Sequence, residues 1–191
     1  SAQALAAVAT GISAVNITGG FLVTKKMLDM FKRPDDPEEH YGLYAIPAGA
    51  MLTGLGTGCA AGMEHVPAAV AVASGVCCIG GIAGLSSQET ARMGNVLGMS
   101  GVAFGVSSVL GTMPLDSTML QVGGLFGVGG AAGYQIAQKV GPTELPQLVA
   151  AFHSLVGLAA VGTAVGDYAA FLADPGTSRK KNTNMKFALT D

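Results

Sequence analysis

Tryptophan is absent from the chain, and charged residues make up only 12% of its 191 residues. Lys and Arg total 10 against 12 Asp and Glu, so the net charge is −2 and the chain lacks the basic field that nucleic-acid binding requires. A soluble domain of this length carries about twice that share of charge. The shortage of charge therefore argues against both a nucleic-acid-binding protein and an ordinary soluble domain.

Cysteine is also scarce. Cys59, Cys77 and Cys78 all lie inside apolar segments, where a thiol packs as a small hydrophobic group. The adjacent pair does not suit an ordinary disulfide framework, and the sequence contains no metal-ligand, Ser-His-Asp or phosphate-loop pattern. We expect no metal site and no redox chemistry. The first segment begins at Ser1 without a basic leader, so we do not expect a signal peptide.

Apolar residues supply half of the chain, and its mean hydropathy is +0.49. Six apolar stretches, each about as long as a helix that crosses a bilayer, are separated by short polar connections. They predict an all-α, polytopic transmembrane bundle of about six glycine-rich helices over 1–173, followed by a polar C-terminal tail, 174–191. The predicted spans lie near 2–24, 43–63, 67–85, 94–113, 119–137 and 145–172.

The basic residues indicate an orientation. Six of them lie in or beside the first, third and fifth connections, which six spans place on one face of the membrane. The positive-inside rule assigns that face to the cytoplasm or matrix, although four basic residues of the tail reduce the difference. The six are Lys25, Lys26, Lys32, Arg33, Arg92 and Lys139.

Glycine predicts how the helices pack. Many of the 29 glycines recur at four-residue spacing, which opens a groove on one helix face where a neighbour can approach closely. We expect such approaches at Gly98 and Gly157. The run Gly123 to Gly133 has the glycine density of a dinucleotide-binding loop, but it lies mid-span without a preceding strand, so helix packing is favoured. Polar residues within spans, such as Asn16, are expected to bond to backbone carbonyls or neighbouring helices.

One histidine, His153, lies in the middle of the last apolar stretch. If Thr143 caps the helix, His153 is about 15 Å deeper along the axis, close to the midplane of the bilayer. An ionisable group at that depth suggests a proton or ion pathway, because its charged form is costly there. The alternative is a neutral imidazole hydrogen-bonded between helices. Asp167 lies about 21 Å farther along the same helix, near the opposite interface.

Four strings of residues point to a family. They cover 21–34, 46–49, 75–99 and the string Glu144-Leu-Pro-Gln-Leu-Val-Ala-Ala-Phe-His-Ser-Leu-Val-Gly-Leu-Ala-Ala-Val161, which is highly specific. In order along about 20–161, they resemble the membrane domain of proton-translocating NAD(P) transhydrogenase. The stretch 41–63 resembles the extra linking span of the fused, mitochondrial form. The resemblance therefore implies the mitochondrial inner membrane as the location, with a bacterial-type plasma membrane as the alternative.

The resemblance also implies roles for residues and partners. His153 would be the channel histidine, and Ser154 would help to hold its ring or a water molecule. In the family, two soluble domains bind NAD(H) and NADP(H), and hydride transfer between them is coupled to proton passage through the membrane domain. This chain is expected to bind neither cofactor and to be inactive by itself, so whether it works as part of an enzyme is left open.

The chain departs from the family pattern in that it lacks both nucleotide-binding domains and the later helices of the membrane domain. The family has further helices after the one that carries the histidine, and they supply an asparagine and an aspartate to the proton path. Three possibilities remain: a subunit of a split transhydrogenase, a fragment, or a transhydrogenase-derived structural subunit of another inner-membrane complex such as a respiratory-chain assembly. We expect helices of another polypeptide to cover the face that carries His153, and nucleotide-binding domains, other inner-membrane subunits and lipid to be its partners.

Overall fold

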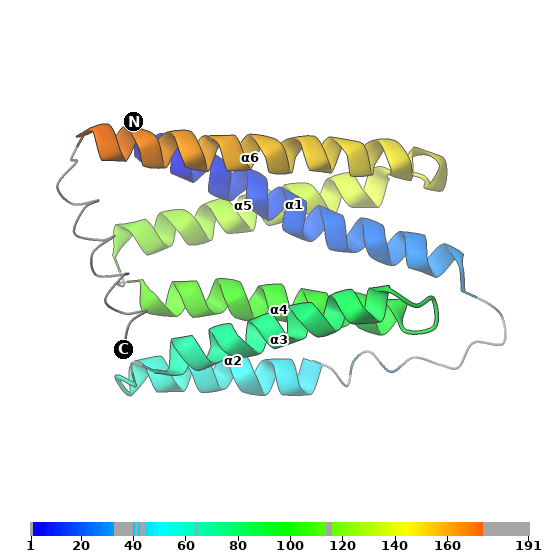
Figure 1. Ribbon diagram of the computed structural model, residues 1–191, viewed down its shortest axis with the longest axis horizontal. Helices are drawn as coiled ribbons and strands as arrows, with labels where there is room; N and C mark the ends of the chain where they lie inside the picture. Colours follow the sequence, from blue (N-terminus) through cyan, green and yellow to red (C-terminus); the bar gives the residue numbers. More distant parts are fainter. Residues whose placement is uncertain are drawn as a thin grey trace. The chain divides into compact units, whose positions relative to one another are not determined.

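The computed structural model describes residues 2–32, 40, 42, 45–63, 65–113 and 116–173, and in these residues it is helical without strands. This confirms the predicted all-α class (Figure 1). Six α-helices occur where the six spans were predicted, and a short 3-10 helix precedes the last of them. They are α1 (Ala2–Met30), α2 (Ala45–Ala60), α3 (Val66–Leu85), α4 (Ala91–Thr112), α5 (Ser117–Lys139), η2 (Pro142–Glu144) and α6 (Leu145–Ala173).

Four of these helices are long and apolar enough to cross a membrane: α1, α3, α4, and η2 with α6. The helix α2 has 16 residues and measures about 24 Å, which is shorter than a hydrocarbon core of about 30 Å. The helix α5 has 23 residues, but Gln121, Gln135 and Lys139 reduce its hydropathy. The predicted C-terminal tail, 174–191, lies outside the described residues.

The chain divides into two compact units. One combines Ser1–Gly20 with Gln121–Asp191, and the other is Phe21–Leu120. The boundary at residue 20 falls inside α1, so the first half of that helix belongs to one unit and its last turns belong to the other.

The second unit is built on the antiparallel pair α3 and α4, which lie side by side in Figure 1. A Cβ on Gly81 would lie 2.9 Å from the backbone nitrogen of Gly98, and a Cβ on Gly84 would lie 2.7 Å from the Cα of Gly94. No side chain fits between backbones at these distances. The glycine-packing prediction is thus confirmed here, and Gly98 also receives the ring of Phe21, whose Cε1 would be 3.4 Å from an added Cβ.

Side-chain hydroxyls join the same two helices. The Ser74 hydroxyl donates to the Gly101 carbonyl at 2.6 Å, and the buried Ser108 hydroxyl donates to the Pro67 carbonyl at 2.9 Å. Thr90, just before α4, donates to a carbonyl in the last turn of α3 at 2.7 Å. These hydrogen bonds form because the backbones of α3 and α4 lie close together. Hydrogen bonds and dispersion contacts therefore both stabilise this helix pair.

The cysteines pack as the sequence predicted. Cys59, Cys77 and Cys78 are free thiols of intermediate burial. Cys59 and Cys77 lie against a core cluster of the second unit formed by Leu55, Val70 and Phe104. The Cys59 thiol also approaches the Gly111 carbonyl at 3.8 Å, which connects α2 to α4.

One end of the second unit brings together parts of two predicted connections. Arg92, in the first turn of α4, donates from its guanidinium to the Leu28 carbonyl in the last turns of α1 at 3.4 Å. A cation near a helix C-terminus is favourable because unpaired carbonyls gather there. Arg92 therefore lies beside the end of α1 that carries Lys25, as expected if the first and third connections share a membrane face.

In the first unit, α1 and α5 also meet through glycine. A Cβ on Gly129 would lie 2.5 Å from the Gly11 carbonyl oxygen and 2.9 Å from the Cβ of Ala14, while a Cβ on Gly133 would collide with the Val15 carbonyl. Both contact positions advance together by four residues along both helices, so α1 and α5 run parallel. The glycine run of α5 therefore serves helix packing.

We predict that Gly81→Ala and Gly75→Ala have opposite effects on stability. Both glycines lie in α3, but a Cβ at Gly75 meets nothing within 4 Å whereas one at Gly81 meets the backbone of α4. Alanine at Gly75 gains about 1 kcal/mol of helix propensity. Alanine at Gly81 forces the helices apart, at a cost of about 1–3 kcal/mol.

The measurement is thermal unfolding of the detergent-solubilised protein, with Gly75→Ala as the matched control. We expect a lower Tm for Gly81→Ala and an equal or higher Tm for Gly75→Ala. Equal Tm values for the two variants would contradict the packing of α3 on α4.

Candidate functional site

The candidate site lies on α6, whose start is set by a turn of 3-10 helix. Thr143, predicted as the helix cap, instead lies inside η2, and the helix begins at Leu145. The Glu144 carboxylate accepts a hydrogen bond from the Gly141 N–H at 3.2 Å. His153 is thus eight residues into α6, about 12 Å along the axis, instead of ten residues beyond a cap.

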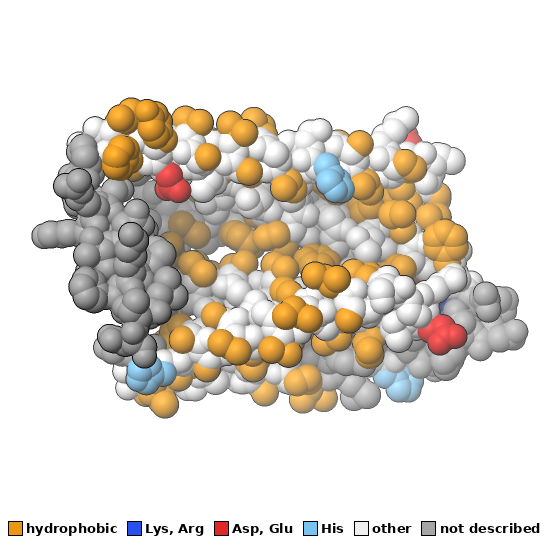
Figure 2. Space-filling view, in the orientation of Figure 1, with side chains coloured by type: hydrophobic (Ala, Val, Ile, Leu, Met, Phe, Trp, Pro, Cys, Tyr) orange, Lys and Arg blue, Asp and Glu red, His pale blue; other side chains and the backbone are white. Residues whose placement is uncertain are grey.

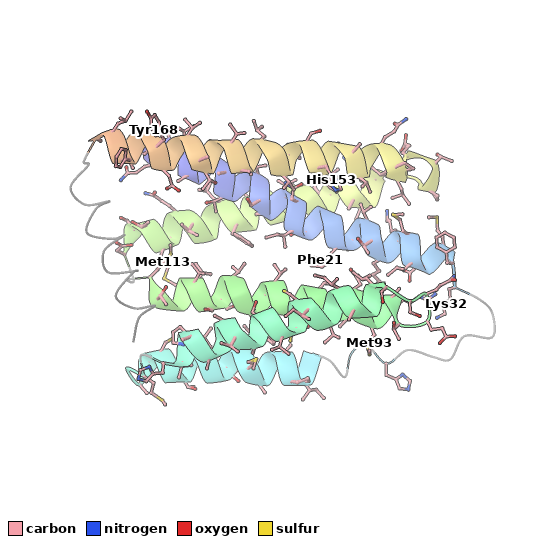
Figure 3. The ribbon with its side chains drawn as sticks, viewed as in Figure 1. Phe21, Lys32, Met93, Met113, His153 and Tyr168 are labelled. Carbon is pink, nitrogen blue, oxygen red and sulfur yellow. The ribbon has the colours of Figure 1, made fainter. Side chains whose placement is uncertain are left out.

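A single stripe of α6 is buried. Leu145, Phe152, Ala159 and Gly166 recur every seven residues, which is two helical turns, and all four are buried in the first unit. His153 follows Phe152 directly and lies about 100° around the helix from this stripe. Its side chain is therefore exposed, and Figure 3 shows it on α6 with no helix of the first unit over it.

Contacts with α1 set the level of His153 along that helix. A Cβ on Gly19 would collide with the Phe152 ring, and a Cβ on Gly162 would lie 3.7 Å from the Cβ of Ala9. The two contacts are ten residues apart on both helices, so α1 and α6 are antiparallel in a one-to-one register. Residue 16, the midpoint of α1, therefore lies level with residue 155 of α6.

His153 is two residues from that level, about 3 Å along the axis. Because α1 is itself 29 residues long and apolar, its midpoint lies near the centre of any bilayer that it spans. The register supports the prediction of a midplane histidine by a route independent of the helix start.

The imidazole is held by its own helix. His153 Nδ1 lies 2.8 Å from the Val149 carbonyl oxygen, one turn earlier. A carbonyl oxygen only accepts hydrogen bonds, so Nδ1 carries a hydrogen and donates it. The other nitrogen, Nε2, is then the atom that gains and loses a proton when the ring changes charge.

The hydrogen bond of the Ser154 hydroxyl does not go to the His153 ring. Its hydroxyl donates to the Ala150 carbonyl at 3.1 Å, again within α6. The ring is thus held by the Val149 carbonyl, and not by the Ser154 hydroxyl as the sequence suggested. A role for Ser154 in binding water stays a prediction.

The surface around His153 is apolar. Figure 2 shows hydrophobic side chains along α6 on both sides of its histidine, and Val156, Leu158 and Val161 are 54%, 58% and 60% exposed. A Cβ at Gly157 meets nothing within 4 Å in the described part of the chain. The prediction of a close approach at Gly157 is thus wrong for this chain's own helices, because Gly157 shares the open face with His153.

Other candidate residues are not brought to this site. Asp167 is exposed 14 residues beyond His153 and lies toward the far end of α6. In the described ranges, no three His, Cys, Asp or Glu side chains come together in a way that could hold a metal ion. The glycine run of α5 is helical throughout, so its backbone N–H groups are engaged in the helix and cannot cradle a pyrophosphate.

Sequence reasoning missed the state of Asn16. Its amide nitrogen donates to the Ile12 carbonyl at 3.2 Å, as expected of an in-span polar residue. Its oxygen, Oδ1, is buried and has no hydrogen-bond partner among the described residues. The sequence shows that an amide lies in the middle of an apolar stretch. Whether its oxygen finds a hydrogen-bond donor depends on which α6 side chains lie at the same level, and the sequence does not show this.

Comparison with known proteins gives two family matches that together cover most of the chain. The family described as NAD(P) transhydrogenase beta subunit matches residues 67–190, and the 4TM region of pyridine nucleotide transhydrogenase matches residues 1–33. The first match contains α3 to α6 and therefore His153. The second contains α1.

Among curated relatives, the NAD(P) transhydrogenase subunit beta of Rhodospirillum rubrum is 46% identical over 95 residues. The match covers 50% of this chain and 20% of the relative, and the same subunit from a defined strain of that species gives the same values. The aligned part of the chain thus corresponds to about a fifth of the length of these relatives. With its apolar helices and a family match over more than half its length, the chain is part of a transhydrogenase membrane domain and belongs to the NAD(P) transhydrogenase beta subunit family.

Proposed function

We propose that this chain forms part of the proton-conducting membrane domain of an NAD(P) transhydrogenase, with His153 as the group that carries the proton near the midplane. The proton movement is coupled to hydride transfer between NAD(H) and NADP(H), which are held by other domains or chains. The observation that carries the proposal is the position of His153: close to the level of the midpoint of α1, exposed on α6, and anchored so that Nε2 is its exchangeable nitrogen.

The anchoring of the ring favours proton transfer over simple packing. Because the Val149 carbonyl keeps Nδ1 protonated in both states of the ring, only Nε2 needs to meet a donor or acceptor. A proton arriving on Nε2 gives an imidazolium, and its departure restores the neutral ring. Alternating access of Nε2 to the two sides of the membrane would then turn this exchange into transport.

The open face of α6 supports a further part of the proposal. An imidazolium beside Val156 and Leu158 is costly in lipid unless water or a polar partner reaches it. We propose that additional transmembrane helices of the same complex cover this face and supply that polar contact. Their presence would also bury the apolar side chains that this chain leaves exposed.

The cofactors belong to the same proposal. NAD and NADP are assigned to partner domains, because the glycine-dense helix of this chain, α5, is engaged in packing against α1 and offers no phosphate-binding loop. We therefore propose that this chain contributes to the membrane step and that the nucleotides are bound elsewhere. We assign the complex to the mitochondrial inner membrane, with a bacterial-type plasma membrane as the alternative.

One observation favours a second function. His153, Ser154 and Thr163 all bond to carbonyls of their own helix, so the hydrogen-bond donor of each side chain is satisfied without a second helix. A transhydrogenase-derived bundle could therefore serve as a structural subunit of another inner-membrane complex, which its glycine-rich helix faces would contact. Identification of co-purifying chains separates the two: nucleotide-binding chains support the enzyme, and respiratory-chain subunits alone support the structural role.

We predict that His153→Ala, made in the complete complex, reduces proton-coupled transhydrogenation by at least about 100-fold, as expected when a proton-transferring group is lost. The measurement is the coupled rate in sealed proteoliposomes under an imposed proton gradient. Since the exposed imidazole contributes little packing, the amount of assembled complex should stay at the wild-type level.

Val156→Ala is the matched control, because Val156 is also exposed on α6 and lies three residues from His153. It should retain the wild-type coupled rate. Wild-type coupling in His153→Ala would remove His153 from the proton path and leave the structural role as the better account.

We predict that Gly157→Leu leaves the chain's own helices intact but reduces assembly with the rest of the complex. A Cβ at Gly157 meets nothing within 4 Å among the described residues, whereas helices covering the face that carries His153 would meet a leucine there. The measurements are Tm of the isolated chain and the yield of co-purified partners, with Gly75→Leu as the control at another open glycine. Unchanged partner yield would show that this face of α6 is not covered.

A further inference from the structure

The unpaired oxygen of Asn16 is the least expected polar group in the first unit. Asn16 lies at the midpoint of α1, 14 residues from both Ala2 and Met30. Its Oδ1 is inaccessible to solvent and accepts no hydrogen bond from the described residues. A buried acceptor without a donor destabilises a fold, and most so at membrane depth, where bulk water does not reach it.

The orientation of the amide cannot be reversed to remove this problem. Asn16 Nδ2 donates to the Ile12 carbonyl at 3.2 Å. If the amide were flipped, two oxygens would face each other, because a carbonyl has no hydrogen to donate. The bond to Ile12 therefore directs Oδ1 away from the backbone of α1.

The helical position of Asn16 places it on the side of α1 that faces α6. Leu5, Ala9 and Gly19 of α1 all contact α6. Asn16 continues this series at spacings of seven and three residues, so it shares their face. In contrast, the α1 residues that meet α5, such as Gly11 and Ala14, lie on the other side of the helix.

At this depth α6 presents only apolar groups to α1. The register set by Gly19 with Phe152 places Asn16 level with residue 155, where α6 presents the buried Phe152 and Ala159 and the half-buried Leu155. None of these side chains can donate a hydrogen bond to Oδ1. The donor must therefore be a small molecule within the interface or a group outside the described residues.

We propose that Asn16 Oδ1 binds a water molecule between α1 and α6 and that this water belongs to the proton path of His153. The proposal rests on the proposed function and adds a second residue to it. Because Oδ1 only accepts, the water donates one hydrogen to it and turns its lone pairs outward. Those lone pairs can then accept a proton from an imidazolium N–H or from a further water at the same depth.

Asn16 and His153 lie at nearly the same level along their helices. Asn16 and His153 are on neighbouring helices of one unit, and their levels differ by two residues, or about 3 Å along the axis. A water at Asn16 thus lies near the midplane with His153 and not at either interface. Because His153 lies about 100° around α6 from the side that meets α1, a further water at this depth would connect the two groups.

The test uses Asn16→Leu in the complete complex, with two companions. Asn16→Asp retains an acceptor, and its protonated carboxyl can still donate to the Ile12 carbonyl. Thr10→Val is the control, because Thr10 is also in α1 and its hydroxyl bonds only within the helix, to the Ala6 carbonyl at 2.8 Å. The coupled transhydrogenation rate in proteoliposomes and Tm are measured for each variant.

We expect the coupled rate of Asn16→Leu to fall at least about tenfold while its Tm stays equal or rises. Leucine replaces a buried amide and its water by an apolar side chain, so the rate should fall without a loss of stability. Asn16→Asp should recover a substantial part of the rate, and Thr10→Val should match the wild type. A parallel fall of rate and Tm in Asn16→Leu, without recovery in Asn16→Asp, would reduce Asn16 to a packing residue.

His153→Ala in the same assay separates this inference from the proposed function. If His153→Ala loses coupling and Asn16→Leu keeps it, the water site is wrong and the proposed function stands. If His153→Ala keeps coupling, the proposed function itself fails. A high-resolution map of the complete complex gives a second test: we expect a water within about 3.5 Å of Oδ1, and a protein donor in that place would overturn the proposal.

Discussion

Close approach of glycine backbones is the constraint on which both units depend. Helices in a bilayer gain little from burying apolar surface, so they associate through dispersion and hydrogen bonds over short distances. Gly81 and Gly84 bring α3 within backbone contact of α4, and Gly129 and Gly133 do the same for α5 against α1. The hydroxyls of Ser74 and Ser108 reach carbonyls of the facing helix only because the backbones are this near.

The rotation of α6 follows from the same constraint. In the first unit, α1 uses one side for α5 and the other for α6, and Gly19 leaves the space that the Phe152 ring occupies. Once Phe152 is inserted there, the helix cannot turn, and His153 is held about 100° away on the open face. A packing contact between a glycine and an aromatic ring thus decides where the exchangeable nitrogen of the histidine is presented.

Much of this fold could be predicted because its signals are local. Long apolar stretches indicate helices by their length alone, and glycine spacing indicates close faces, so all six helices and the packing role of the α5 glycines were anticipated. The start of α6 at Leu145 agrees with the predicted span, but the suggested cap at Thr143 was wrong, because Thr143 lies inside η2 and Glu144 satisfies the turn before the helix. Gly157 was assigned to a close approach because spacing does not tell which face of a helix meets a neighbour.

The site was predictable in part for the same reason. His153 stands out as an ionisable residue in an apolar stretch, but its bond to Val149 and its exposure depend on the rotation of α6, which no sequence pattern encodes. Asn16 was expected to bond to a backbone carbonyl or a neighbouring helix, and its bond to the Ile12 carbonyl agrees with that, but its unpaired oxygen depends on the apolar residues that α6 presents at its level. Both features come from tertiary contacts between distant segments.

The most direct measurement is the protonation state of His153 during turnover. The chain contains three histidines, so replacing His40 and His65 by Gln leaves His153 as its one remaining imidazole. With ring-labelled histidine incorporated into this chain alone and the complex reconstituted, infrared difference spectra under an imposed proton gradient report the charge of that ring. The account predicts interconversion of neutral imidazole and imidazolium in step with hydride transfer. A ring that stays neutral throughout coupled turnover would contradict it.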